Sequence, residues 1–460
     1  MAKRKPYFYE ALISILGLIL IMGISLVKYE TDPHIPMLLG SVIAGLVAYK
    51  AGYDWKYIER GMIEGITQAL QSVIILTIIG VLIGVWIQAG VVPSMIYYGF
   101  NILSPRIFLL ATLLICSVTS LATGTSWGTV GTVGIALMGI AQGLGVPAPI
   151  AAGAIISGAY FGDKMSPLSD TTNLAPAVAG TDVFTHVRHM IYTTGVTYII
   201  VAILYLVLGM KFGSGEMTIS TINEIKEGLE AQFFISPLLL IPPLVVITCV
   251  ALKAPAIPSI TLGVILGALE AAIFQKADLG TIITAGYSGY VSETGGQLID
   301  ELLTAGGMTA MSYSISLTIA AMMFGGILEK TGQMEALMKP ILKRLKSDGS
   351  LIFATIASCV ATNMLLPEQY ISIVVPGRMY ADVYKERGLH PKNLSRALED
   401  GGTITSVLVP WNTCGAFMKD ILGISAAAYG PWAFLNYINP IVSIIYGFTG
   451  FTIERLNEDE

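Results

Sequence analysis

Long runs of apolar residues follow one another along nearly the whole chain, each separated from the next by a short polar segment. Runs of about 17–25 apolar residues have the length that crosses a bilayer as a helix, and their succession leaves no room for a soluble domain. In the first half they predict spans at 8–28, 35–53, 68–91 and 187–210, a bent pair of helices at 106–145 and an interrupted span at 148–178. In the second half they predict spans at 235–253, 258–275, 311–328 and 430–453, a bent pair at 351–390 and an interrupted span at 394–418. The pattern is typical of an all-α polytopic membrane protein.

The second half repeats the order of segments of the first. A constant offset of 243 residues pairs Ala111 with Ala354, Thr112 with Thr355, Cys116 with Cys359, Thr119 with Thr362, Gly134 with Gly377, Gly145 with Gly388, Gly158 with Gly401, Pro167 with Pro410 and Gly180 with Gly423. Duplicated positions keep their spacing, whereas chance matches scatter. Coincidence among abundant glycine and alanine is the alternative, which the paired Thr, Cys and Pro disfavour. We therefore predict two repeats, 1–210 and 234–460, joined by a polar extracytoplasmic connector at 211–233.

Each predicted repeat has about five full crossings and a bent pair that returns to its starting side, as a re-entrant hairpin does. Because five is odd, the second repeat must be inverted relative to the first, an arrangement found in many secondary transporters. Charge placement is an independent indication, since cytoplasmic loops carry an excess of Lys and Arg. The basic residues predicted on one side are Lys3, Arg4, Lys5, Lys50, Lys56, Arg60, Arg188, Lys253, Lys339, Lys343, Arg344, Lys346, Lys385, Arg387, Lys392 and Arg396. We expect a multi-pass protein of the cytoplasmic membrane with both termini in the cytoplasm.

Composition narrows the function classes further. Apolar residues make up 54% of the chain and charged residues only 12%, far from the values of soluble domains. The net charge of -5 is small and spread over loops, which gives no indication of a nucleic-acid partner. The four cysteines lie in apolar segments without CxxC spacing, so we interpret them as small buried side chains.

Two acids and a lysine stand close together in the stretch GDKMSPLSDTTN, residues 162–173, inside an otherwise apolar segment. A charge at the centre of a spanning helix costs roughly 2.5–3.5 kcal/mol, so Asp163, Lys164 and Asp170 need water, an ion or a partner charge. Pro167 lacks a backbone donor and should break the helix, which leaves free carbonyls at membrane depth. Hard oxygen ligands of the kind that Na⁺ prefers lie in the same break, at Ser166, Ser169, Asp170, Thr171, Thr172 and Asn173. We predict a Na⁺ site at Asp170 and its neighbours.

The alternative is a surface loop, in which Asp, Ser, Thr, Asn and Pro are ordinary turn formers. The flanking apolar segments are too short to span separately, and the repeat partner breaks at the corresponding Pro410. In that partner, Asn412 and Thr413 occupy the positions of Ser169 and Asp170. Glu399 and Asp400 lie earlier in the same segment, either within the membrane or at its solvated cytoplasmic end.

The bent pairs have polar tips that would meet these breaks near the midplane. The first tip, SLATGTSWGTVG, offers the hydroxyls of Thr123, Thr125 and Ser126, beside glycines that permit a tight turn or simply close helix packing. The second tip, TNMLLPEQY, contains Asn363 and Glu368. Glu368 next to Pro367 is a candidate proton carrier or cation ligand; an interfacial ion pair with Arg378 is the other interpretation.

A bound cation and a proton compete for a carboxylate in such a setting. That competition is the minimum requirement for antiport, and Asp163 and Asp170 are the leading candidates for it. Lys164 would either neutralise one of them or pair with an acid of the other half.

Two further function classes fit less well. An intramembrane enzyme would use Ser126 as a nucleophile, but His34, His186, His189 and His390 all fall in predicted loops or span ends, which leaves no obvious base. We expect all four histidines to be solvated or interfacial, and the chain not to be an enzyme. A channel is disfavoured because matching broken helices in inverted repeats are typical of alternating access.

Four stretches, GTSWGTVGTVGIALMG (124–139), GAIISGAYFGDKMSPLSDTTNLAPAVAGTD (153–182), PEQYISIVVPGRMY (367–380) and HPKNLSRALEDGGTITSVLVPWNTCGA (390–416), resemble signatures of the NhaC-type sodium/proton antiporters. The resemblance implies a ten-span inverted-repeat fold with two re-entrant hairpins and exchange of external H⁺ for internal Na⁺. It also extends to a branch similar to sodium- and proton-coupled malate/lactate exchangers, so an organic-anion exchanger stays open as the rival.

The expected partners follow from this interpretation. They are the lipid bilayer and the transported ions Na⁺ and H⁺, with no cofactor and no nucleic acid. A homodimer is compatible with the sequence.

Overall fold

The computed structural model describes residues 3–29, 31–212, 219–252, 254–293, 299–300, 303–342, 345–366 and 368–456. Within them the chain is helical apart from turns, bends and two isolated β-bridges, which confirms the predicted all-α class. The helices of the first half are α1 Phe8–Gly23, α2 His34–Lys50, α3 Trp55–Gln68, α4 Leu70–Gln88, α5 Val91–Ile102, α6 Phe108–Thr123, α7 Ser126–Thr129, α8 Ile135–Gly143, α9 Ala148–Met165, α10 Asp170–Ala179 and α11 Val183–Phe212. Those of the second half are α12 Ile219–Gln232, α13 Ile241–Ala251, α14 Ala256–Phe274, α15 Leu279–Ser288, α17 Ser312–Lys330, α18 Gln333–Leu342, α19 Asp348–Leu365, α20 Gln369–Glu386, α21 Pro391–Leu398, α22 Ile404–Ser406, α23 Thr413–Leu422, α24 Ala426–Tyr429 and α25 Phe434–Thr449.

Several of these helices can cross a bilayer. Among the described residues, five are long and apolar enough by length and composition, namely Leu70–Gln88, Val183–Lys211, Ala256–Phe274, Met308–Lys330 and Asp348–Leu365. A sixth candidate is the pair Ile222–Gln232 and Pro237–Cys249, which is bent by 95°. The chain is therefore a multi-pass membrane protein, and the predicted number of ten spans stays a prediction. Among the described α-helices, six lie outside the predicted spans, namely α3, α5, α12, α15, α18 and the short α24.

Large apolar side chains on the outside of the molecule support the same conclusion. On α11 alone, Ile191, Ile199, Ile203 and Val207 are each at least half exposed, whereas Val201 on the same helix is fully buried. A soluble monomer rarely exposes a continuous apolar face of this kind, so this face of α11 is suited to lipid.

The two halves have matching helix boundaries at the offset found in the sequence. Adding 243 to the bounds of α10 gives those of α23, and adding it to the first residue of α9 gives that of α21. The residues that end α10 and α23, Gly180 and Gly423, both have left-handed backbones, with φ of 86° and 69°. These correspondences support the predicted repeat; its inverted orientation and the division at 211–233 stay predictions, and residues 213–218 of that connector lie outside the described part.

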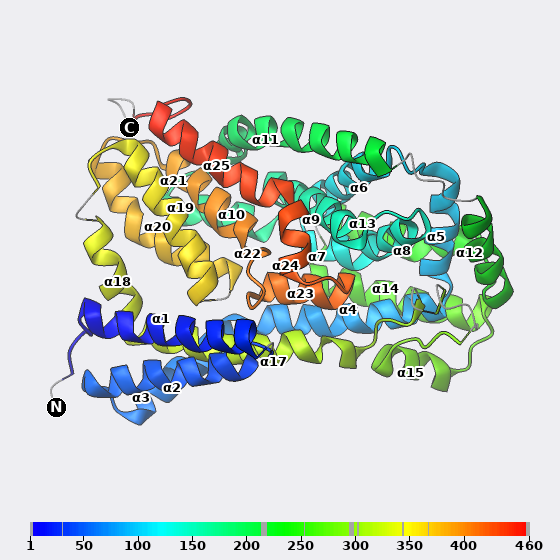
Figure 1. Ribbon diagram of the computed structural model, residues 1–460, viewed down its shortest axis with the longest axis horizontal. Coiled ribbons are helices and arrows are strands. Elements are labelled where there is room, and N and C mark those ends of the chain that lie inside the picture. The colour runs from blue at the N-terminus through cyan, green and yellow to red at the C-terminus, as the bar shows by residue number, and fades with distance from the viewer. Residues whose placement is uncertain are drawn as a thin grey trace.

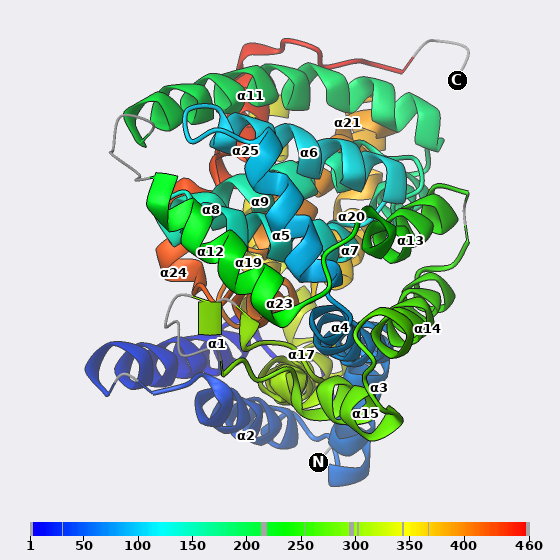
Figure 2. The same cartoon turned by 90° about the vertical axis from the view of Figure 1, so that its right-hand side faces the viewer.

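Helices from both halves make up each of two layers (Figures 1 and 2). The lower layer in both views holds α1 to α4 with α14, α15 and α17, and the upper layer holds α6 to α11 with α19 to α21 and α25, while α23 lies at the boundary between them. Within the lower layer α17 packs on α2 and α3, while α4 packs on α14 and α15. Because α4 and α17 occupy corresponding places in the two halves, this exchange of partners is what a twofold relation between repeats would produce.

Both termini lie at one end of the molecule, on the left in Figure 1. Ion pairs connect them to segments predicted on the cytoplasmic side: Lys5 pairs with Glu335 at 2.6 Å, Arg455 with Asp348 at 2.9 Å, and Lys392 with Glu454. The fold thus brings several of the predicted cytoplasmic segments to the same end.

Close helix contacts in the lower layer require glycine. A Cβ added at Gly65 of α3 would lie 2.3 Å from the carbonyl oxygen of Met322 and 2.9 Å from the Cα of Gly326, both on α17. Because these are backbone atoms, the helices themselves would have to separate.

We therefore expect Gly65→Ala to destabilise the protein by about 1–3 kcal/mol, the usual cost of overpacking. The measurement is the midpoint of thermal unfolding in detergent, followed by size-exclusion elution. Gly23→Ala is the matched control, because no described atom outside its own helix lies within 4 Å of its added Cβ. An unchanged midpoint in Gly65→Ala would contradict the close packing of α3 on α17.

Candidate ion-binding site

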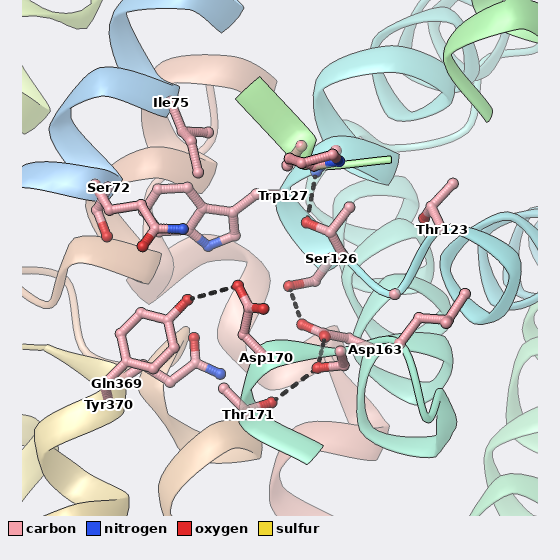
Figure 3. Close-up of a pocket in the computed structure, with 18 of the residues that line it drawn as sticks. Ser72, Ile75, Thr123, Ser126, Trp127, Asp163, Asp170, Thr171, Gln369 and Tyr370 are labelled. Carbon is pink, nitrogen blue, oxygen red and sulfur yellow. Dashed lines mark hydrogen bonds between the residues drawn. The ribbon is translucent and has the colours of Figure 1, made fainter. Parts of the chain in front are cut away.

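A cavity of about 450 Å³ lies between the two layers. Its walls come from the start of α4, the α6–α7 tip, the break between α9 and α10, residues 254–256 and the start of α20 (Figure 3). The first bent pair and the first interrupted helix therefore meet at one cavity, as the sequence predicts. Helix α4 also lines this cavity, which the sequence did not predict.

Asp163 is the acidic group with the most complete set of polar neighbours in this cavity. Its Oδ2 accepts a hydrogen bond of 2.6 Å from the hydroxyl of Ser126, and its Oδ1 accepts one of 2.6 Å from the hydroxyl of Ser169. The hydroxyl of Thr171 lies 3.1 Å from that of Ser169 and extends the cluster. Asp163 is only 6% exposed. Three side-chain hydroxyls and a carboxylate thus converge, supplied by the tip and by the break.

The break itself forms as the proline predicts. Helix α9 ends at Met165, Ser166 is extended with φ of -85° and ψ of 122°, and α10 begins at Asp170. Lys164 is fully buried and Ser169 is 1% exposed, so the stretch is not a surface loop.

Three of the predicted ligands instead bind backbone carbonyls, in the break itself or near the end of α6. The hydroxyl of Ser166 donates to the carbonyl of Leu121 at 2.7 Å. The hydroxyl of Thr172 lies 3.1 and 3.0 Å from the carbonyl oxygens of Asp163 and Lys164. The amide of Asn173 donates to the carbonyls of Pro167 and Ser169. Because carbonyls at the end of a helix need partners, these side chains stabilise the break and do not face the cavity.

Four other predicted residues do line the cavity: Thr123, Thr125, Asp170 and Glu368. Asp170 is exposed toward it, and its Oδ2 lies 3.5 Å from the hydroxyl of Tyr370, at the outer limit of a hydrogen bond. Thr125 also caps α7, since its hydroxyl accepts from the amide of Gly128. Glu368 is 2% exposed and faces the cavity; the neighbouring Pro367 lies outside the described residues.

The second break holds a separate polar cluster. Asn363 donates to the carbonyl of Gly402 at 2.7 Å, and Asn412 donates to the backbone and side-chain oxygens of Asn363. At the offset of 243 residues, Ser120 corresponds to Asn363 and Ala159 corresponds to Gly402. Ser120 donates to the carbonyl of Ala159, so the first half has the equivalent hydrogen bond. Asn363, Asn412 and Thr413 are buried at this break and do not line the cavity.

Lys164 pairs with an acid of the other half, which is one of the two alternatives that the sequence left open. Its Nζ lies 2.5 Å from Oδ1 of Asp400, and both side chains are fully buried. Asn439 donates to the same oxygen at 2.6 Å. Glu399 is also fully buried, so the interpretation that Glu399 and Asp400 are solvated at a helix end is wrong. The two broken helices are thereby joined by a charge pair away from the cavity.

Two of the four histidines are not solvated; whether they lie at the membrane interface stays a prediction. His186 is fully buried, with its Nδ1 2.8 Å from the hydroxyl of Ser395, and His189 is 2% exposed. Both lie on α11, which packs against α21, and the hydroxyl that contacts His186 belongs to α21. Neither ring faces Ser126, whose hydroxyl donates to Asp163.

Five polar or aromatic residues of the cavity were missed in the sequence: Gln71, Ser72, Trp127, Gln369 and Tyr370. Gln71 and Ser72 are a polar pair at the start of an apolar run, which is a weak but readable signal. The others lie beside the predicted Ser126 and Glu368.

The described residues hold no group of three or more His, Cys, Asp or Glu side chains that could bind a metal ion. The cluster at Asp163 is not such a group, because the hydroxyls of Ser126, Ser169 and Thr171 supply most of its oxygens. Hydroxyl, carbonyl and carboxylate oxygens suit a hard cation rather than a transition metal.

The Lys164–Asp400 pair allows a test of how the breaks are joined. Removing one partner leaves a buried unpaired charge and typically costs about 3–5 kcal/mol, whereas replacing both by apolar residues is often nearly neutral. We expect Lys164→Met and Asp400→Leu each to lower the thermal unfolding midpoint more than the double variant does. A double variant as unstable as the sum of the single ones would contradict direct pairing.

Comparison with known proteins agrees with the geometry. The model of a family described as the Na+/H+ antiporter family matches residues 158–451. The chain is 38% identical over 449 residues to the Na(+)/H(+) antiporter NhaC of Alkalihalophilus pseudofirmus, covering 97% of this chain and 96% of the relative.

Two further relatives have names that specify other cargoes. The chain is 40% identical over 448 residues to the malate-2H(+)/Na(+)-lactate antiporter of Bacillus subtilis, covering 97% of this chain and 96% of that protein. It is 37% identical over 462 residues to the arginine/ornithine antiporter ArcD of Halobacterium salinarum, covering 100% of this chain and 95% of that protein. By the family match and by these near full-length similarities, the chain belongs to the Na+/H+ antiporter family.

Proposed function

We propose that the protein exchanges Na⁺ for H⁺ across the cytoplasmic membrane by alternating access, with Na⁺ export driven by H⁺ entry. The observation that carries the proposal is the buried carboxylate of Asp163 between the hydroxyls of Ser126 and Ser169, each 2.6 Å away. A carboxylate with adjacent hydroxyl oxygens can bind either a small hard cation or a proton, and not both at once.

Asp163 can be ionised, bound to Na⁺ or protonated, and each state requires a different orientation of the Ser126 and Ser169 hydroxyls. When Asp163 is ionised and binds no cation, both serines donate to it, and the structure places their hydroxyls 2.6 Å from its two oxygens. When Na⁺ binds, the hydroxyl oxygens direct lone pairs to the ion and give up those hydrogen bonds. When a proton binds instead, the carboxyl group becomes a donor to a neighbouring oxygen, and the attraction for Na⁺ is lost. The site therefore releases Na⁺ when it gains H⁺.

Asp170 would act as a second carboxylate on the way to this site, because it lies on the exposed side of the same cavity. The predicted inversion of the two repeats would allow the cavity to open alternately to either side of the membrane. In this proposal the end that gathers the termini faces the cytoplasm, and a dimer is compatible with it.

The rival function is Na⁺- and H⁺-coupled exchange of organic anions, as the name of the Bacillus subtilis relative states for that protein. The cavity argues against it for this chain. Its described lining residues include Asp163, Asp170 and Glu368 but no Lys, Arg or His. Lys164, the nearest lysine in sequence, is paired with Asp400. A carboxylate substrate would meet three acids there and no basic side chain among the described lining residues.

Proteoliposomes with an acidic interior and a trapped pH dye test the exchange. We expect NaCl added outside to alkalinise the interior, Asp163→Asn to abolish the response, and Ser126→Ala to raise the apparent KM for Na⁺ about 10- to 100-fold, as the loss of a hydrogen-bonding partner of a charged group predicts. Ser41→Ala is the matched control, since that buried hydroxyl donates within its own helix to the carbonyl of Met37.

Full Na⁺-driven alkalinisation by Asp163→Asn would overturn the assignment. Size-exclusion elution of each variant separates loss of transport from loss of folding. A signal that needs malate or lactate on one side would establish the rival function.

Competition between Na⁺ and H⁺ for Asp163 also predicts how the apparent KM for Na⁺ changes with pH. Since a protonated Asp163 cannot bind Na⁺, lowering the pH on the Na⁺ side should raise the apparent KM for Na⁺, by up to about tenfold per pH unit once the carboxyl group is mostly protonated. The maximal rate at saturating Na⁺ should change much less. Initial rates over a grid of Na⁺ concentration and pH measure both, and an apparent KM that does not vary with pH would contradict a shared site.

A further inference from the structure

The cavity is far larger than a bound Na⁺ requires. Its volume of about 450 Å³ lies in the range of sites that hold small organic ligands, roughly 300–1,000 Å³. The Asp163 cluster occupies only one wall, beside the α6–α7 tip (Figure 3). The charge and the aromatic rings of the remaining walls restrict which other ligands can bind.

The charge of the cavity favours a cation. Asp163, Asp170 and Glu368 line it, and its described lining residues contribute no basic side chain. Glu368 is 2% exposed, and its Oε2 has no hydrogen-bond partner in the described part of the chain. A buried carboxylate oxygen that faces a cavity without a partner is suited to a donor from a ligand.

The helix N-termini at the cavity do not reverse this preference. Helices α10 and α20 both begin there, and the N-terminus of a helix attracts negative charge. Asp170 is the first residue of α10, and Glu368 is the N-cap residue of α20. Each terminus therefore already has an acidic side chain of the protein beside it, which weakens its attraction for a substrate carboxylate.

Two aromatic rings add a feature that a bare metal ion does not need. Trp127 and Tyr370 both line the cavity, and in Figure 3 they flank the carboxylate of Asp170. The ring of Trp127 is held by stacking on Phe417, with 4.5 Å between centroids and 9° between planes. A fixed tryptophan beside a carboxylate is a favourable environment for an organic ammonium group.

We propose that this cavity binds an aliphatic amine cation that carries no carboxylate, such as a diamine, as a cargo that competes with Na⁺. The inference rests on the proposed function, since it extends the cargo of the same site. One ammonium group would contact Asp163 or Glu368, and the alkyl chain would lie along Trp127 and Ile75. The side-chain nitrogen of Gln369 has no partner among the described residues and could donate to a carboxylate, but a neutral amide supplies no counter-charge.

The test is counterflow of radiolabelled putrescine at pH 7 into proteoliposomes preloaded with unlabelled putrescine. Protein-free liposomes correct for passive diffusion, and Na⁺-driven alkalinisation is measured on the same preparation. We expect uptake above the protein-free level, inhibition by external NaCl, and a 3- to 30-fold loss of apparent putrescine affinity in Trp127→Leu, larger than its effect on Na⁺. Trp55→Leu, at an exposed tryptophan outside the cavity, is the matched control.

The outcomes separate this inference from the proposed function. Na⁺/H⁺ exchange without putrescine uptake overturns the inference alone, and putrescine counterflow without Na⁺/H⁺ exchange overturns the proposed function alone. Counterflow of malate or lactate, but not of putrescine, overturns the choice of a cation. Uptake that neither NaCl nor Trp127→Leu affects overturns the placement of the amine in this cavity.

Discussion

A helix that is interrupted inside a membrane must have its free backbone groups satisfied by the protein, and the rest of the site depends on this constraint. At the break between α9 and α10, Thr172 lies within hydrogen-bonding distance of the carbonyls of Asp163 and Lys164, and Asn173 binds the carbonyls of Pro167 and Ser169. With the last turn of α9 fixed in this way, the side chain of Asp163 is held opposite the α6–α7 tip. The residues that close the break and those that face the cavity therefore do different work, although they stand side by side in the sequence.

Helix geometry explains why the adjacent charges of Asp163 and Lys164 face different parts of the protein. Successive residues of a helix point about 100° apart, so Asp163 faces the cavity while Lys164 faces the second half of the chain. There it pairs with Asp400, which also accepts a hydrogen bond from Asn439. The pair joins the two broken helices in the upper layer, where each half contributes an interrupted helix. A movement of one break relative to the scaffold would thus tend to carry the other with it.

Much of the fold was predictable, because apolar length and a helix-breaking proline are local properties of the sequence. The interrupted span, the cavity-facing Asp163 and Ser169, and the constant offset of 243 all follow from such features. Two kinds of error show the limit. Ser166, Thr172 and Asn173 have the same oxygen and nitrogen atoms whether they bind an ion or cap a backbone, so composition could not separate the two roles. The burial of His186 and His189 was not predicted, because α11 packs against α21, more than 200 residues further along the chain. Gln71 and Ser72 reach the cavity only through the packing of the two layers.

The cargo of such a site is decided by a few side chains rather than by the fold. Relatives that are 37–40% identical over nearly the whole chain have names that specify a metal cation, organic anions or amino acids as cargo. In this chain the hydroxyl groups around Asp163 occupy one wall of the cavity, and other side chains line the remaining volume. The charge of that lining limits the cargo, because a substrate carboxylate needs a cation within reach. In this chain the nearest lysine in sequence, Lys164, is already paired with Asp400. A lysine or arginine at the position of Gln71, on α4, would supply that cation away from either break, so this position is where a change of cargo would be expected to arise.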